Sequence, residues 1–537
     1  MSVLLAISPL ILIFLLMTVW RRTADVAGLI GWAYTALLAA TYFHTAWWVI
    51  LVGSVAGIVA SFPISLMVVT SIFQINVMEE AGAIRRLVVF MKTLARDNRA
   101  AQVMLINVGA GTLLAALGAT PVSILPPIML SLGYSAFVAI ALPAIGYDAL
   151  CTYALLGVPV VVFADVAKGI TGIEFTPAQV GLYFAQYMPV ITSLIALSML
   201  WLVGGWKEVR RGWVVALLTG VTAGTIAIGM NVAGLPSLTG VVAGAGVVLV
   251  MLAYVRLRGD RLVDRSVLAE EDRTVERGMR LGLAVLPWIL LVVFSALTNY
   301  AGFGLYDVLF KKLAMPVEIV PGRPERMRML WQAYTWVLVA TLIAIPFYRM
   351  GAARLAAAGR KTLRRAPRPA FAAAVYFAIA FVLNHSGKAP APAGGPAGWV
   401  MDPAGLNMVK VVADASAGVF GQAYAGVAAF LGLLGGFISG SEASAIAMLS
   451  KLHFETMAQV FAGTDPERLL RISLLVAAVS GIGGGLASVI SPAKLQNAAA
   501  VIDRIGMESQ VIRATVVIAV LMVLAAALLT FVFLGRM

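Results

Sequence analysis

Two polar interruptions within the apolar stretch of residues 432–497 decide the fold. Residues 435–444 read GGFISGSEAS and place a carboxylate among small and hydroxyl residues. Residues 483–485 are a glycine triplet, and residues 488–497 then read SVISPAKLQN. Irregular backbone is tolerated at membrane depth only where it lines a cavity or is buried in protein. Paired interruptions of this kind therefore predict broken helices that meet at a functional site.

The composition is that of a membrane protein. Of the 537 residues, 61% are hydrophobic and only 12% are charged. Soluble domains carry about 25% charged residues, and the mean hydropathy of +0.95 excludes that class. Each bilayer crossing needs about 20 apolar residues, and long apolar segments recur along the chain. We therefore expect an all-α, polytopic transmembrane bundle of about 12–14 spans in contact with membrane lipids.

The charge balance points to the membrane surface as well. Lysine and arginine number 39 against 25 aspartate and glutamate residues, so the net charge is +14. The basic residues lie in short loops, as positive-inside retention predicts, and we expect no nucleic-acid partner. The single cysteine, Cys151, excludes an intrachain disulfide and is predicted to pack in an apolar segment. Residues 3–20, which precede Arg21 and Arg22, are predicted to be a retained span that starts outside.

The chain is predicted to be one integral membrane domain, residues 1–537. It divides into an N-terminal half of about 1–256 and a C-terminal half of about 281–537, joined by a cytoplasmic loop at 257–280. Each half has a glycine-rich broken segment followed by a long interrupted one, at 102–132 and 136–164, and again at 431–451 and 471–500. This layout predicts inverted repeats that share one site at the midplane.

Proline and glycine predict where the N-terminal segments break. Pro63 should give the segment 46–77 a kink or a re-entrant turn. Glycines and Pro121 should divide 102–132 into two half-helices, and Pro143 together with Tyr147-Asp148 should interrupt 136–164.

Loop charges orient the chain across the membrane. The basic loops are expected inside and the loop 165–176 outside, provided that 102–132 returns to the side from which it entered. The loop 301–328 falls outside although it is basic. The Pro/Gly-rich loop 387–403 is predicted to be a flexible extramembrane connector. The basic loops in question contain Arg85, Arg86, Lys92, Arg96, Arg99, Lys207, Arg210 and Arg211, and span residues 256–280 and 349–368.

Four stretches of the C-terminal half resemble a known family. They are residues 380–387 (AFVLNHSG), 437–444 (FISGSEAS), 490–492 (ISP) and 506–509 (GMES). In order, they resemble the Asn-aromatic-Ser-Gly helix end, the Gly-Ser-Asp turn, the Ile-Ser-Pro break and the Gly-x-Glu-Ser segment of the lactate permease family. This family consists of 2-hydroxymonocarboxylate:proton symporters. The resemblance implies transport of lactate, and of glycolate, with a proton across the cytoplasmic (inner) membrane.

The N-terminal half departs from the family pattern. Leu113 stands where the family has a carboxylate, and Tyr147-Asp148-Ala149-Leu150 replaces an Asn-Thr-Ala-Pro segment. Ser488 stands where the family has a lysine, while Lys494 lies beyond the break. The chain is therefore identified as a divergent member, for which another small organic anion, or Na⁺ in place of the proton, is the alternative.

Glu442 is the first candidate for proton coupling. A carboxylate at the centre of a spanning helix costs about 2.5–3.5 kcal/mol and is usually functional. Carboxylates that are removed from water bind a proton more readily. In the structural alternative, the hydroxyl groups of Ser439, Ser441 and Ser444 hold this carboxylate and lock the turn.

Asp148 is the second candidate for proton coupling, with a structural role as its alternative. Lys494 is expected to neutralise the carboxylate of an anionic substrate. Otherwise it pairs with Glu442 or Asp148, or extends to the membrane interface. Backbone N–H groups that follow Ser441 and Ser491, at the starts of half-helices, also suit a carboxylate.

The other substrate-binding candidates are polar or turn residues at the breaks and at one helix end. Capping is the alternative for Ser491, Ser386 and Asn384, and an unspecialised interfacial residue is the alternative for the histidine. No pattern suggests a metal or a cofactor. These candidates are Asn384, His385, Ser386, Ser439, Gly440, Ser441, Ser491, Gln496 and Asn497.

Two other classes of protein fit the sequence less well. The best carboxylate pair for a membrane enzyme, Asp260 and Asp264, lies in a loop dense with compensating charge. A channel would usually show rings of charge or a repeated filter motif, and neither is present. The sequence therefore predicts a secondary active transporter rather than an enzyme.

Overall fold

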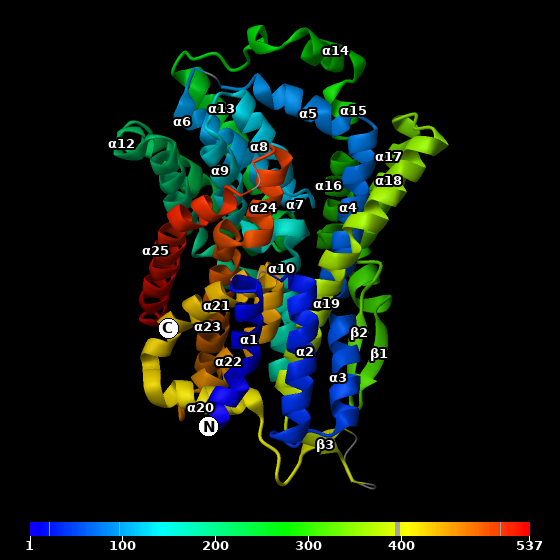
Figure 1. Cartoon of the computed structure of the whole chain (residues 1–537), viewed down its shortest axis with the longest axis vertical. Coiled ribbons are helices and arrows are strands. Elements are labelled where there is room, and N and C mark those ends of the chain that lie inside the picture. The colour runs from blue at the N-terminus through cyan, green and yellow to red at the C-terminus, as the bar shows by residue number, and fades with distance from the viewer. Residues whose placement is uncertain (21, 96, 393–397, 505) are drawn as a thin grey trace.

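A computed structural model describes residues 1–20, 22–95, 97–392, 398–504 and 506–537. It confirms the all-α membrane fold, because ten helical runs within these residues are long and apolar enough to cross a membrane. Figure 1 shows an elongated molecule in which most of these helices follow the long axis. Arg21, Arg96 and residues 393–397 of the predicted connector lie outside the described residues.

Before the loop at 257–280 the chain forms two helices of 17 and 18 residues and then two helices that meet next to Pro63. A hairpin, a broken segment and further spans follow. Their bounds are α1 Ser2–Thr18, α2 Ala24–Thr41, α3 Trp47–Ala60, α4 Phe62–Glu80, α5 Ala83–Lys92, α6 Arg99–Val103, the π-helix η1 Met104–Ala110, α7 Gly111–Ala116, α8 Pro121–Ser131, α9 Ala136–Asp148, the 3₁₀ turn η2 Cys151–Tyr153, α10 Ala154–Thr171, α11 Pro177–Ala185, α12 Met188–Val232, η3 Pro236–Leu238 and α13 Thr239–Leu257.

The helices after this loop include a second hairpin and a second broken segment. Their bounds are η4 Arg265–Val267, α14 Glu270–Gly278, α15 Leu281–Ala284, α16 Leu286–Asn299, η5 Ala301–Phe303, η6 Asp307–Lys312, α17 Ala333–Phe347, α18 Ala352–Arg365, α19 Pro367–His385, α20 Met408–Phe420, η7 Gly421–Ala423, α21 Tyr424–Ser439, α22 Glu442–Val460, α23 Pro466–Leu486, η8 Ala487–Ile490, α24 Pro492–Val501 and α25 Glu508–Leu534.

Two small antiparallel sheets lie in loops. Strand β1 (Met315–Val320) pairs with β2 (Arg323–Met327), and β3 (Lys388–Pro390) pairs with β4 (Trp399–Met401). The connector predicted at 387–403 thus contains a short antiparallel pair, at residues 388–390 and 399–401. Backbone hydrogen bonds between the strands hold these two segments together.

The long helical pairs of the two halves run antiparallel along much of the molecule. Gly57 of α3 lies against the backbone of Ala378 in α19, and Asn76 of α4 donates a hydrogen bond to Thr362 of α18 at 2.9 Å. The kink predicted at Pro63 is confirmed, since α3 ends at Ala60 and α4 begins at Phe62. These paired helices give the chain a rigid frame.

The predicted hairpin at 102–132 is confirmed. Helices α6 and α7, with the π-turn η1 between them, lead inward, and α8 leads back after the turn at Gly118. The two ends of the hairpin lie together, because Arg99 stacks over the ring of Tyr134 and the Tyr134 hydroxyl donates to Gln102 at 3.1 Å. The segment therefore returns to the face from which it entered.

The second hairpin, α21 and α22, turns at Gly440 and packs closely on α23. A Cβ atom on Gly436 would lie 2.1 Å from the Gly484 carbonyl oxygen, so glycine permits this approach. The chain then enters α23 with Asp465 as N-cap, whose side chain accepts from the Arg468 backbone N–H. A hairpin followed by a broken segment thus occurs both before and after the loop at 257–280.

One predicted break was misplaced. Pro143 lies inside α9, which continues to Asp148. The chain leaves helical geometry only after that residue, and Leu155, Leu156 and Gly157 have left-handed φ values of 54°, 58° and 78°. Proline is tolerated inside this membrane helix because buried neighbours can replace the lost backbone bond.

The basic loops gather on one face of the molecule. Arg85 pairs with Glu271 at 3.4 Å and Lys92 with Asp272 at 3.1 Å, so the loop 257–280 lies over α5. Lys361 reaches Glu80 at the end of α4 at 2.6 Å. We refer to this face as the basic face.

The anomalous basic loop 301–328 lies on the opposite face. Its Arg328 side chain is only 6% exposed and pairs with Asp165 at 3.3 Å and with Glu174 at 3.1 Å. Lys311 pairs with Asp307 of the same loop at 2.6 Å. Local carboxylates therefore compensate charge that the positive-inside rule would not place here.

Candidate functional site

The two broken segments meet near the middle of the molecule, where Figure 1 places α10 and the ends of α21–α23. Helix α9 of the first segment packs on η8 of the second, and η2 packs on α23. Residues from both breaks and from the second hairpin turn form a group that we call the central cluster, in which Tyr147 and Lys494 are half-buried and the others are buried. It consists of Tyr147, Asp148, Cys151, Thr152, Glu442, Ser488 and Lys494.

Glu442 is the first residue of α22 and is only 4% exposed. Gly440, with φ of 68°, and the N-cap Ser441 turn the chain so that the Glu442 side chain points inward. The Thr152 hydroxyl donates to Glu442 Oε1 at 2.6 Å, and the Cys151 thiol lies beside the carboxylate. Within the described residues Glu442 Oε2 has no hydrogen-bond partner.

Gly485 makes room for this carboxylate. A Cβ atom at this position would lie 2.7 Å from Glu442 Oε2 and 3.4 Å from the Cys151 Cβ atom. Real Cβ contacts are not that short, so only glycine lets the carboxylate sit against α23. The last glycine of the triplet thus has a specific steric role.

Asp148 and Lys494 face each other across the break. Asp148 is 5% exposed at the end of α9, next to Ser488 and the Val489 backbone N–H. Neither of its oxygens forms a hydrogen bond of good geometry with a described residue. Lys494 Nζ donates to Ser488 Oγ at 2.5 Å and lies 4.1 Å from the centroid of the Tyr147 ring. Ser488 therefore stands between the Lys494 ammonium group and the Asp148 carboxylate.

The arrangement suits a small anion. Two buried carboxylates and one half-buried ammonium group lie together, and α22 and α24 both begin beside them. The N-terminus of a helix carries a partial positive charge and free N–H donors, which stabilise a carboxylate. Within the described residues no ion pair closer than 4.0 Å joins Lys494 to Asp148 or Glu442. The ammonium group can therefore turn toward a third carboxylate.

Residues 2–535 match the family model for L-lactate permease. The chain belongs to the L-lactate permease family. The glycolate permease GlcA of Escherichia coli K12 is 24% identical over 96% of this chain and 92% of that protein. L-lactate permeases of Bacillus subtilis 168 (23% identical, 99% and 95% covered) and Streptococcus iniae (25%, 83% and 89%) are also similar. As a member of this family the chain is a permease and not an enzyme.

The hydroxyl groups of Ser439, Ser441 and Ser444 do not hold the Glu442 carboxylate in this permease. Ser439 Oγ donates to the carbonyl groups of Gly435 and Ser441 at 2.8 and 2.9 Å, and Ser441 Oγ accepts from the Ser444 N–H. These bonds lock the turn, but the partner of Glu442 comes from the other half of the chain. The structural alternative for Glu442 was therefore wrong in its partners.

The candidates around Ser491 differ in their environment. Ser491 is buried at the start of α24 but forms no side-chain capping bond, so the capping alternative was wrong. Gln496 and Asn497 are exposed, and Asn497 donates to Ser123 of α8 at 2.8 Å. The structure therefore does not bring these two amides into the central cluster.

Asn384, His385 and Ser386 lie at the far end of α19, away from the central cluster. The Ser386 side chain is buried, donates to the Leu383 carbonyl and accepts from the Met408 N–H, both at 2.7 Å. It is therefore a structural bond between α19 and α20. Asn384 and His385 instead line a cavity of about 830 Å³ on the side opposite the basic face, which we call the large cavity.

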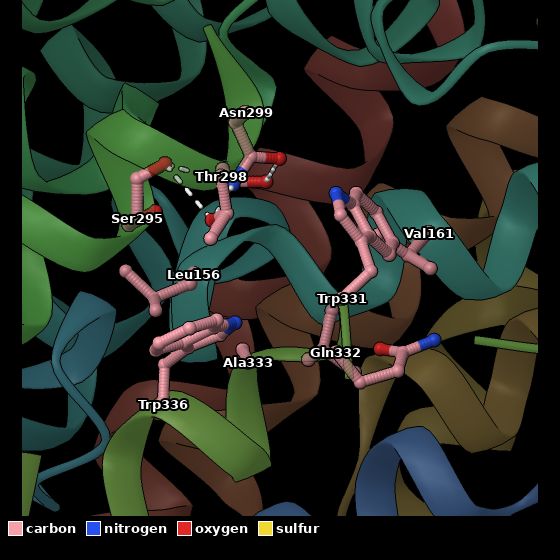
Figure 2. A pocket seen from close by; sticks show the side chains of 11 residues that line it. Leu156, Val161, Ser295, Thr298, Asn299, Trp331, Gln332, Ala333 and Trp336 are labelled. Atoms are coloured by element: carbon pink, nitrogen blue, oxygen red, sulfur yellow. Dashed lines mark hydrogen bonds between the residues drawn. The ribbon is translucent and has the colours of Figure 1, made fainter. Parts of the chain in front are cut away.

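A second, small cavity lies between α10, α16 and α17 (Figure 2). Ser295, Thr298, Asn299 and Trp331 line it, and its volume of about 20 Å³ holds no more than a water molecule. It is too small for an organic anion. Within the described residues no three His, Cys, Asp or Glu side chains gather as metal ligands.

Sequence reasoning did not name Tyr147, Cys151, Thr152 or Ser488 of the central cluster as site residues, nor Gly485 beside it. Thr152 and Cys151 come from the break between α9 and α10, and Gly485 comes from the glycine triplet. Their only signal in the sequence was their position in or next to an interrupted apolar segment. Nothing local indicates that residues about 290 positions apart would form a hydrogen bond.

Proposed function

We propose that this permease carries a small 2-hydroxymonocarboxylate, lactate or glycolate, across the cytoplasmic membrane together with a proton. The relatives named as lactate and glycolate permeases support the substrate class. The central cluster is the observation that supports the mechanism. In this proposal the two halves, about 1–256 and about 281–537, move one bundle against the other around the cluster.

Lys494 and the starts of α22 and α24 would receive the substrate carboxylate. The Lys494 ammonium group already contacts Ser488 and the Tyr147 ring, so a small turn of its flexible stem would meet an anion in the break. Donors at Ser488 and Ser491 lie within the same break and suit the 2-hydroxyl group.

The charges of the cluster supply the reason for proton coupling. Asp148 and Glu442, if ionised, together with Lys494 give one net negative charge. A bound monocarboxylate would make two, and a buried uncompensated charge costs several kcal/mol. One proton on Glu442 returns the loaded site to the charge of the empty site. The loaded and the empty permease would then change conformation at equal electrostatic cost, and one proton would accompany each anion.

Uptake of labelled L-lactate into proteoliposomes tests this proposal, beside glycolate, pyruvate and acetate. An alkaline interior, by one pH unit, should drive accumulation of up to about tenfold, because one unit is worth about 1.4 kcal/mol. A protonophore should abolish it. Lactate flux that follows a Na⁺ gradient instead would contradict proton coupling. No flux of lactate or glycolate, with reconstitution verified, would contradict the substrate.

A further inference from the structure

The large cavity has an apolar floor and charged walls. Helices α10, α19 and α22 and the junction of α3 with α4 surround it. Phe62, Val162, Phe377 and Ala447 contribute apolar surface, which we call the floor. Ala447 lies five residues after Glu442 on α22, which is about 7 Å along the helix axis. The floor is therefore close to the central cluster.

Among the described residues, cations exceed carboxylates along the walls. Glu174 and Asp414 lie beside the cavity, and together with the carboxylates of the lining they are still fewer than the lysine and arginine residues of the lining. A cleft with low-dielectric walls focuses the field of such charges and raises the local concentration of anions. The charged lining residues are Lys168, Arg328, Lys388, Lys410 and Lys451, against Asp165 and Glu455.

Lys451 occupies the position between the floor and the walls. It lies one turn of α22 beyond Ala447, so both residues face the cavity. Its ammonium group donates to the Asn384 carbonyl oxygen at 2.5 Å, and the same oxygen accepts from Asn407 Nδ2 at 3.1 Å. Helices α19, α20 and α22 thus meet at one carbonyl group. This contact fixes the Lys451 ammonium group at the wall of the cavity.

A second cationic group lies on the same side. Lys388 Nζ is 3.3 Å from His385 Nδ1, and the His385 ring packs edge-on against Trp399 with ring centroids 5.0 Å apart. The pairing of β3 with β4 holds this segment. His385, Lys388 and Lys451 are therefore ordered around the end of α19.

We propose that Lys451, Lys388 and His385 form an outer capture site for the carboxylate of a small monocarboxylate, distinct from the central cluster. This inference rests on the proposed function, because it concerns the route of the same substrate. A cavity of this size usually holds a much larger ligand. A small anion would keep part of its water there and bind weakly. It would then pass over the apolar floor to Glu442 and Lys494, which α22 joins to Lys451 over about 13 Å.

Initial rates of L-lactate uptake into right-side-out vesicles, with wild-type protein and Lys451→Gln, test the capture site. At low ionic strength the KM of Lys451→Gln should rise about fivefold, the factor that one unit charge at about 4 Å contributes in water. Vmax should stay within about twofold of wild type. Salt should raise the wild-type KM more than that of the variant, since the screening length falls from about 30 Å at 0.01 M to about 10 Å at 0.1 M.

Two further variants separate charge from structure. Lys451→Arg keeps the charge and should keep the wild-type KM, while Lys207→Gln, on the basic face, removes a charge away from the cavity and should change nothing. An unchanged KM in Lys451→Gln, or a lower Vmax at constant KM, would overturn the capture site while lactate flux in the wild type upholds the proposed function. Absence of lactate flux in the wild type would overturn the proposed function and this inference with it.

Discussion

Replacement of Glu442 by glutamine removes the proton-binding group while keeping its shape. Glutamine retains an oxygen that can accept from Thr152, whose hydroxyl donates to Glu442 Oε1 at 2.6 Å. Its amide fits the same buried space beside Gly485 and Cys151. The variant should therefore fold, and its cluster should hold a fixed charge equal to that of the protonated wild type.

The expected effect follows from the charge balance of the cluster. With one proton for each anion, a gradient of one pH unit supports an accumulation ratio of up to about ten. In Glu442→Gln no proton is bound or released at this position, so the ratio should fall to about one. Exchange of labelled for unlabelled lactate needs no net proton movement. It should continue, and its rate should no longer depend on pH.

Proteoliposomes measure both quantities on the same preparation. Accumulation is read under the imposed gradient, and exchange is read at equal lactate on both sides. Glu467→Gln, an exposed residue in the first turn of α23, is the matched control and should behave as wild type. Tenfold accumulation by Glu442→Gln, with the pH dependence of the wild type, would refute the reasoning. Asp148 would then be the candidate for the proton-binding residue.

Three more predictions concern the same cluster. Alkylation of Cys151, which lies beside Glu442, should abolish transport, and saturating lactate should slow the modification. Gly485→Ala should lower the transport rate at least about tenfold, because its Cβ would lie 2.7 Å from Glu442 Oε2 and displace the carboxylate. Lys494→Gln should raise the KM for lactate about tenfold, the effect of losing about 1.4 kcal/mol of substrate binding.

Each of these predictions has its own control. Cys151→Ala should transport and resist the reagent, and equal sensitivity would exclude the thiol as the target. Gly418→Ala, where no atom lies within 4 Å of the added Cβ, should transport normally, and normal transport by Gly485→Ala would disprove the steric role. A Lys494→Gln variant with an unchanged KM would show that this lysine does not meet the substrate. Chromatographic profiles of the purified variants check that they fold.

Much of the fold was predictable because the membrane requires long apolar helices, so that both the spans and their polar interruptions are evident in the sequence. Apolar length sets the spans, and a carboxylate or a glycine triplet stands out against an apolar background. The hairpins at 102–132 and 431–451 and the return of the first one to its own face followed from such signals. Pro143 was a false signal, since a buried membrane helix can absorb a proline without breaking.

The candidate site was only partly predictable. Glu442, Asp148 and Lys494 were marked by the cost of burying charge in a bilayer. The sequence did not reveal their hydrogen-bond partners. Serine, threonine and cysteine are common in membrane helices, and burying these uncharged side chains does not have the free-energy cost of burying a charge. Asn384 and His385 were grouped with Glu442 by resemblance, yet they line the large cavity instead.

The sequence by itself determined an all-α membrane protein with two hairpins, two broken segments and a buried carboxylate. Only the tertiary structure decided that Thr152 donates a hydrogen bond to Glu442 and that Ser488 stands between Lys494 and Asp148. It also decided that Lys451 lines a separate cavity. The physical reason is the range of the interactions. Hydropathy and backbone hydrogen bonding act within a segment, whereas the partner of a buried polar group depends on where helices from two halves of the chain cross.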